Sequence, residues 1–254
     1  MSPISLFTKK PAEVVLIEEF IHKSKEGAPD ALRAVVAAGP AVVDRLTPLL
    51  TVDKSHPDAV RRNAMHALGR IGDPRAVEPL LPLLNDNDPS IRAETAAVLG
   101  RLGDKRAVEP LIAKLSDGYA VCSAAAKALG RLGDRRAVEP LMNMLTTGCY
   151  ECGREAAAEA LGELGDLRAA LALVALLPDP DAALRKIAAV ALHRMGWKPP
   201  SAETRAMWLV AMQDWDGCIV MGRDAVPQLT LAINSADFDI AFHATNALNA
   251  INKQ

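Results

Sequence analysis

The phrase ALGRIGDPRAVEPLLPLL at residues 67–84 recurs as VLGRLGDKRAVEPLIAKL at 98–115 and as ALGRLGDRRAVEPLMNML at 128–145. A degraded fourth copy, ALGELGDLRAALALVALL, occupies residues 160–177. The aspartates that follow the second glycine of each copy are 31, 30 and 32 residues apart. A fixed period of this length is typical of repeat proteins, in which each unit buries its apolar face against its neighbours.

Each copy contains two amphipathic segments, and both have the spacing of a helix face. In the unit that begins at Pro89, the first stripe is Ile91, Thr95, Val98 and Leu102, at the spacing of one face of a helix. Asp88 and Pro89 predict the start of this helix, and Gly103 predicts its end. Pro110 must lie in the first turn of the second helix, because a deeper proline would remove a backbone hydrogen bond. The RAV residues before it are therefore predicted to form a tight turn or a short 3₁₀ helix.

Composition agrees with thin, closely packed helices. Half of the 254 residues are hydrophobic and only 4 % are aromatic, while the formal net charge is −2. The pI near 6.2 disfavours general nucleic-acid binding, which a basic domain usually signals. The sequence shows neither the apolar core of a signal peptide nor an apolar run of about 20 residues. The four cysteines then read as reduced thiols, and we expect a cytoplasmic protein that does not contact a membrane.

The chain is predicted to be one all-α solenoid over residues 1–254, made of about six to seven helical hairpins with terminal caps. Residues 11–52 are interpreted as an N-terminal cap and first repeat, 53–196 as central repeats, and 197–254 as a C-terminal insert and cap. The repeat pattern breaks after Gly196, and the three tryptophans Trp197, Trp208 and Trp215 all lie beyond that break. We interpret them mainly as cover for the end of the core.

The phrase ALGRLGD-x-RAVEPL, with an arginine some seven residues before its Leu-Gly pair, resembles HEAT-like repeats of the phycobilisome-lyase type. That resemblance implies a right-handed α-α superhelix whose second helices line the concave side. It does not imply one function, since the family includes bilin lyase subunits, an iron-dependent hydroxylase and proteins that only bind partners. The hydroxylase carries His-Glu pairs that hold its metal. No His-Glu dipeptide occurs here, so that enzyme is excluded.

The repeated charges are the first candidate site. An arginine recurs before the core of each first helix and an aspartate recurs in each turn, so stacked units would carry ladders of opposite charge. These could form an anion-binding ridge, but pairing with turn backbone and neighbouring carboxylates is the favoured interpretation. The arginines are Arg61, Arg92, Arg154 and Arg185, and the turn aspartates are Asp73, Asp104, Asp134 and Asp166.

The second candidate departs from the repeat. Cys122 stands where the other units have this arginine, and the next loop is longer and contains Cys149 and Cys152. Tyr119 and Tyr150 occupy equivalent loops one unit apart. These five residues are predicted to cluster on one edge and to contact a partner, since tyrosine is enriched at interfaces. A redox pair, half of a zinc site and chance substitution stay open as alternatives; no metal or cofactor is expected.

The third candidate is the surface of the second helices, which carries Lys114 and Asn143 between core positions. This surface is narrow, mildly apolar and weakly charged, and therefore suits a peptide better than DNA. No catalytic constellation is visible. The sequence favours a non-enzymatic scaffold that binds a protein partner through the concave face and one edge. The alternative is a phycobilin lyase-type subunit acting with a partner; a nucleic-acid binder is disfavoured by charge.

Overall fold

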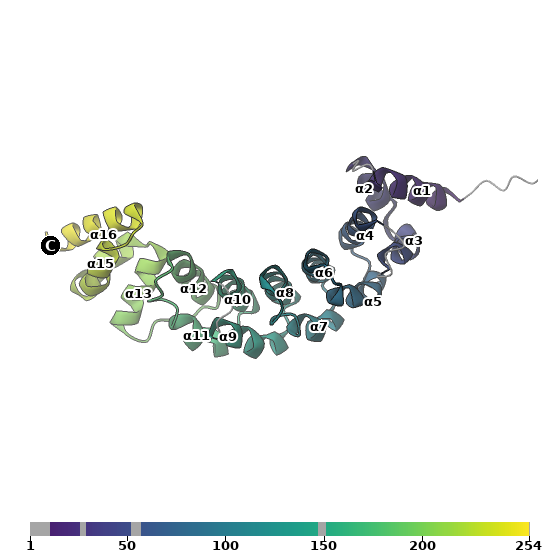
Figure 1. The fold of residues 1–254 in the computed structure, drawn as a ribbon. Coiled ribbons are helices and arrows are strands. Elements are labelled where there is room, and N and C mark those ends of the chain that lie inside the picture. Colours follow the sequence, from purple (N-terminus) through teal and green to yellow (C-terminus); the bar gives the residue numbers. More distant parts are fainter. Residues whose placement is uncertain (1–10, 26–28, 52–56, 147–150, 254) are drawn as a thin grey trace, which may run out of the picture. The chain divides into compact units, whose positions relative to one another are not determined.

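The computed structural model describes residues 11–25, 29–51, 57–146 and 151–253 of the chain (Figure 1). Every regular element in these residues is a helix, which confirms the predicted all-α solenoid. No helix among them is both long and apolar enough to cross a membrane. The chain divides into two compact units, Met1–Leu132 and Gly133–Gln254. The assignment of residues 1–254 to a single solenoid stays a prediction.

The first unit contains eight α-helices and five 3₁₀ helices within the described residues. They are α1 (Ala12–Lys25), α2 (Pro29–Ala38), η1 (Gly39–Val42), α3 (Val43–Leu46), η2 (Thr47–Leu50), α4 (Asp58–Ile71), η3 (Pro74–Ala76), α5 (Val77–Leu80), η4 (Leu81–Asn85), α6 (Pro89–Leu102), η5 (Lys105–Ala107), α7 (Val108–Ile112) and α8 (Tyr119–Leu132).

The second unit continues with the same alternation and then changes after α12. Its described elements are η6 (Arg135–Ala137), α9 (Val138–Thr146), α10 (Glu151–Leu164), η7 (Leu167–Ala169), α11 (Ala170–Val174), α12 (Ala182–Arg194), α13 (Ala202–Met212), α14 (Trp215–Met221), η8 (Gly222–Ala225), α15 (Val226–Ile233) and α16 (Phe238–Ile251).

One repeat shows how the sequence produces the hairpin. The Asp88 side chain accepts the N–H of Ser90 at 2.8 Å and caps α6, which satisfies a backbone donor that lacks a partner within the helix. Gly103 ends α6 with φ 72°, a left-handed conformation that costs glycine little. The residues before Pro110 form the 3₁₀ helix η5, as predicted, and Pro110 is the third residue of α7.

Neighbouring first helices approach each other at a glycine of the repeated phrase. In the first unit α6 packs between α4 and α8, and these three helices lie side by side in Figure 1. A Cβ added to Gly100 would lie 2.7 Å from the Cα of Ala128, closer than a real Cβ approaches another atom. Gly162 of α10 meets Ala191 of α12 in the same way, with 2.9 Å to the Cα. The stack therefore needs a residue without a side chain at this position.

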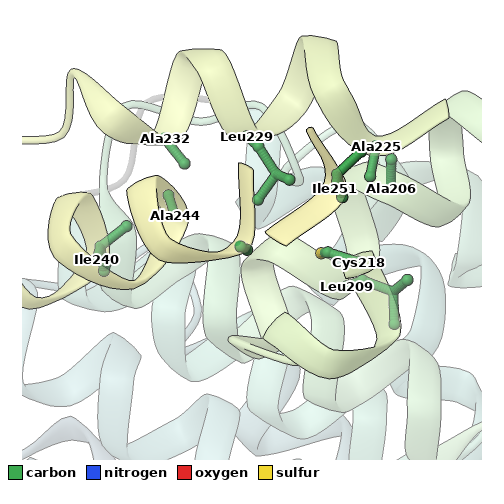
Figure 2. Close-up of a cluster of buried hydrophobic side chains, with 10 residues drawn as sticks. Ala206, Leu209, Cys218, Ala225, Leu229, Ala232, Ile240, Ala244 and Ile251 are labelled. Carbon is green, nitrogen blue, oxygen red and sulfur yellow. The ribbon is translucent and has the colours of Figure 1, made fainter. Parts of the chain in front are cut away.

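The C-terminal helices enclose a core of their own (Figure 2). Helix α13 packs against α12, α14 and α15, so it follows α12 in the place of a second helix, and α14 packs against α16. Trp208 and Trp215 lie half-buried against this core, and the Trp208 indole donates to the Ala189 carbonyl at 3.0 Å. The core consists of Ala206, Leu209, Cys218, Ala225, Leu229, Ala232, Ile240, Ala244, Ala247 and Ile251.

The close contact at Gly100 predicts the effect of a single methyl group. Gly100→Ala should destabilise the protein by about 1–3 kcal/mol, because the added Cβ meets the backbone of α8 and overpacks the interface. The better helix propensity of alanine offsets only about 1 kcal/mol of this. The free energy of unfolding in urea measures the change.

Gly118→Ala is the matched control, because no atom lies within 4 Å of a Cβ added there. This variant should unfold within about 0.5 kcal/mol of the wild type. Equal stabilities for the two variants would show that α6 and α8 can separate without loss.

Candidate functional site

In three repeats the arginine of the first helix clamps the loop that follows its own second helix. Arg92 binds Asp117 with two hydrogen bonds, Nε to Oδ2 at 3.0 Å and Nη2 to Oδ1 at 2.8 Å. Arg61 pairs with Asp86, and Arg154 Nη2 lies 2.6 Å from Asp179 Oδ2. Each aspartate follows its arginine by 25 residues. Hydrogen bonds between charged groups are the stronger class, and the Arg92 pair is also bidentate, so these pairs hold their three hairpins closed.

The carboxylates of Asp117 and Asp179 stay ionised because of their partners. Hydrogen bonds from Arg92 hold the pKa of Asp117 below its ordinary value, against the opposing effect of partial burial. The same aspartate accepts the N–H of Gly118 at 2.7 Å. Lys114 of the second-helix surface lies 3.7 Å from the Asp117 carboxylate and adds a weaker attraction. Burial raises the pKa of Asp179, but bonds from the Asp181 N–H and Arg154 bring it below its usual range.

A second set of charges holds the turns between helices. The Asp104 side chain accepts the Arg106 N–H at 2.9 Å and also binds the Arg106 guanidinium at 2.7 Å. The same guanidinium reaches the preceding repeat, where it binds Glu78 at 3.0 Å and the Pro74 carbonyl at 3.1 Å. Arg75 makes the equivalent bonds to Asp44 and the Pro40 carbonyl. These arginines connect successive repeats, which supports their structural interpretation over an anion-binding ridge.

Acid should weaken this turn network in a defined pH range. Hydrogen bonds from the Arg168 side chain and N–H lower the pKa of Asp166 to about 2. A carboxylate with a lowered folded-state pKa stabilises the fold above its unfolded pKa, and the benefit is lost as the pH falls through the folded value. The stability difference between wild type and Asp166→Asn should therefore be full at pH 6 and should shrink between about pH 4 and 2. Urea unfolding across this range measures it; a constant difference would contradict the assignment.

The predicted cysteine and tyrosine edge is described only in part. Tyr119 is the first residue of α8 and is half exposed, whereas Cys122 is fully buried with its Sγ 3.3 Å from the Tyr119 carbonyl oxygen. Cys149 and Tyr150 lie outside the described residues, and Cys152 belongs to α10 without a described side chain. Cys122 therefore packs in the core of α8 and does not present its thiol at the surface. The proposed cluster of all five residues stays a prediction.

No group of three or more histidine, cysteine or acidic side chains in the described part of the chain is arranged to hold a metal ion. The zinc and redox alternatives for the Cys149 and Cys152 pair stay untested, because these side chains lie outside that part.

Cys218 is a second buried cysteine at the arginine position of a first helix, and sequence reasoning missed it. It is the fourth residue of α14, as Arg92 is the fourth residue of α6. Ser235 lies two residues before the helix-capping Asp237, as Asp86 lies two residues before Asp88, and its Oγ accepts the Asp237 N–H at 3.2 Å. Burial raises the pKa of the Cys218 thiol to about 11. Arginine and aspartate are thus both absent, so neither clamp residue is left without its partner.

The second-helix surface of the first unit contains a shallow groove. Its volume is about 420 Å³, and Lys114, Ala113 and Pro82 lie along it. Lys114 is half-buried there. Asn143 belongs to α9 of the second unit, where it is exposed and its carbonyl accepts the Thr146 hydroxyl at 3.0 Å. The structure therefore places Asn143 on the second helix α9 and Lys114 in the turn that follows the second helix α7, both at solvent-accessible positions of their respective units.

A larger pocket of about 850 Å³ lies in the second unit, and we refer to it as the C-terminal pocket. It is bounded by the loop before α12, by α13, and by α15 with the loop that leads to α16. Arg185 is the one cationic residue among its lining residues. Sequence reasoning missed this pocket because it depends on where α13 and α15 pack. Its lining residues are Leu177, Pro178, Asp179, Pro180, Asp181, Ala182, Arg185, Met207, Val210, Ala211, Gln228, Leu231, Ala232, Asn234, Ser235, Ala236 and Asp237.

The stacked helical hairpins, their glycine contacts and their arginine clamps define an α-solenoid repeat protein. The family model of HEAT repeats matches residues 16–91, 77–157 and 111–193. The chain therefore belongs to the HEAT-repeat family, which confirms the resemblance to HEAT-like repeats.

Comparison with the curated proteins gives no match. Among solved structures, the complex of CpcE and CpcF of phycocyanin lyase from Nostoc sp. PCC7120 is 24% identical and has a TM-score of 0.48, with 92% of this chain and 94% of that chain covered. An engineered protein is 23% identical with a TM-score of 0.46, covering 83% and 96%. Human deoxyhypusine hydroxylase is 18% identical with a TM-score of 0.40, covering 84% and 96%.

Proposed function

We propose that this protein is a non-enzymatic scaffold that binds a segment of a partner protein, with the C-terminal pocket as a principal contact. The observation that carries this proposal is the pocket itself, a space of about 850 Å³ in the second unit. That volume is in the range of sites that hold ligands of several residues or of drug size. Repeat proteins of stacked helices commonly use such surfaces to bind partners.

The lining of the pocket is of the kind that binds a protein segment. Leu231 has 67% of its surface exposed and lies beside Met207 and Val210, so burial of this apolar surface would favour association. Gln228 and Asn234 add amide groups that can bond to a peptide backbone. An apolar lining with few polar groups is usual at binding sites.

The second-helix surface and the edge at Tyr119 are proposed as further partner contacts, each within its own unit. Both remain proposals, as does the cytoplasmic location. A bilin lyase-type subunit is the alternative function, and a coloured phycobiliprotein on co-expression with a bilin source would support it. The proposed scaffold needs no chromophore, so this experiment separates the two functions.

Affinity capture from the native cell, followed by mass spectrometry, tests the proposal with matched variants. Leu231→Asp places a charge in the apolar part of the pocket and should reduce recovery of the partner about tenfold or more, since it opposes burial of the contact. Val220→Asp is the control, because Val220 is 83% exposed on α14 and lies outside the pocket lining.

Both substitutions affect exposed side chains, so both variants should unfold at the wild-type temperature within a few degrees. A partner that is recovered equally with wild type and Leu231→Asp would contradict a role for the pocket. Loss with both variants would point to a different surface of the second unit.

A further inference from the structure

Arg185 holds the same repeat position as Arg92 and makes the same bonds to the loop before its helix. Arg185 Nη1 donates to the carbonyls of Asp179 and Pro180, at 2.8 and 3.0 Å. Arg92 Nη1 donates in the same way to the carbonyls of Asp86 and Asn87, at 2.8 and 3.3 Å. The two guanidinium groups are therefore anchored alike by one of their nitrogens.

The two guanidinium groups differ in what their Nε and Nη2 atoms bind. Arg92 directs Nε and Nη2 to the carboxylate of Asp117, 25 residues later. The residue 25 positions after Arg185 is Val210, and no carboxylate pairs with Arg185 in the part of the chain that the structure describes. Arg185 and Val210 both line the C-terminal pocket. The carboxylate that closes the hairpins of Arg61, Arg92 and Arg154 is thus missing at this pocket.

We propose that the C-terminal pocket binds an acidic side chain of a partner protein, whose carboxylate pairs with the Nε and Nη2 edge of Arg185. The partner residue would take the role that Asp117 has toward Arg92. This inference rests on the proposed function, which it deepens by naming the chemistry of the bound segment. Bidentate pairing with a carboxylate is the interaction for which the planar guanidinium is best suited.

Three aspartates belong to the pocket lining, and unpaired they would repel an acidic ligand. Asp179 is already paired with Arg154, and Asp181 and Asp237 each accept helix N–H groups as caps. The repeat that contains Arg92 shows that such surroundings accept a further carboxylate, that of Asp117.

Asp86 and Asp88 both act on Arg92, where they correspond to Asp179 and Asp181 at Arg185. Asp117 nevertheless occupies this site with a lowered pKa, because its bonds to Arg92 outweigh the opposing effect of partial burial. A ligand carboxylate at Arg185 therefore has a precedent within the same chain.

The apolar part of the pocket defines the neighbours of the acidic residue. Met207, Val210 and the exposed Leu231 line the same space as Arg185. A segment with aspartate or glutamate next to one or two large apolar residues would fill both parts. Binding would then combine apolar burial with one oriented charge pair.

Phage display of random 12-residue peptides on the full-length protein tests this chemistry directly. The wild type should enrich peptides in which an acidic residue adjoins apolar residues. In the tightest peptide, replacing the acidic residue with its amide should weaken binding about 10- to 100-fold, the range for a hydrogen-bonded charged group. Arg185→Gln should cause a similar loss, and Arg185→Lys a smaller one, because lysine keeps the charge without the fork.

The two changes should not add, because they remove the same contact: the amide peptide should bind Arg185→Gln and wild type equally well. Val220→Asp should bind the acidic peptide as the wild type does. Thermal unfolding followed by circular dichroism reports whether the Arg185→Gln variant is folded. If that variant does not fold, binding of the amide peptide to the wild-type protein still tests the contact.

Additive losses, or enrichment of no peptide, would overturn the inference. Enrichment of lysine or arginine peptides that Asp237→Asn abolishes would also overturn it, in favour of a basic segment. A native partner that depends on Leu231 but binds Arg185→Gln with unchanged affinity would leave the scaffold function standing and remove only the carboxylate contact. Loss of Leu231 dependence would instead remove the scaffold function at this pocket.

Discussion

The pairing of a first-helix arginine with a loop aspartate is the constraint on which three of the central hairpins depend. Arg92 reaches back to the carbonyls of the preceding loop and forward to Asp117, so one side chain fixes both loops at the same end of the hairpin. An exposed ion pair is worth little, but this one is half-buried, bidentate and joined to backbone carbonyls. Removal of either partner would leave the other without its bonds, and the two residues are therefore expected to change together.

The chain shows such joint changes within its own repeats. Where the arginine position holds Cys122, the position 25 residues later is Thr147 rather than aspartate. Where it holds Cys218, the loop before the next helix uses Ser235 to accept the capping N–H. A small thiol packs without a charge, and a hydroxyl can still satisfy the backbone. Arg185 differs from both, because the arginine is kept while the aspartate is absent.

Local features of the fold could be predicted from the sequence because their causes are local. Asp88, Gly103 and Pro110 act within one or two helical turns, so the cap, the helix end and the 3₁₀ helix follow from their spacing. The C-terminal pocket could not be predicted, since it depends on the packing of α13 and α15, which no repeat specifies. The unpaired edge of Arg185 had a visible signal, because the 25-residue spacing of the other pairs fails at Val210.

The fate of Cys122 also shows why an exception in a repeat need not face solvent. Its position lies on the inner side of the first helix, where Arg61 is itself almost completely buried. A substitution at this buried position therefore alters the packing inside the hairpin and leaves its exposed surface largely unchanged. Tyr119, three residues earlier, is half exposed and belongs to the outer side of the same turn.

The two buried thiols offer a way to measure local opening of the protein. Cys122 lies in the first compact unit and Cys218 in the second, and both are fully buried. Thiols react as thiolates, and burial suppresses that form, so an alkylating reagent can modify these residues only when their surroundings open. The alkylation rate of Cys122 thus reports local opening of the first unit, and that of Cys218 reports local opening of the second. Mass spectrometry of the two peptides measures both rates in one sample.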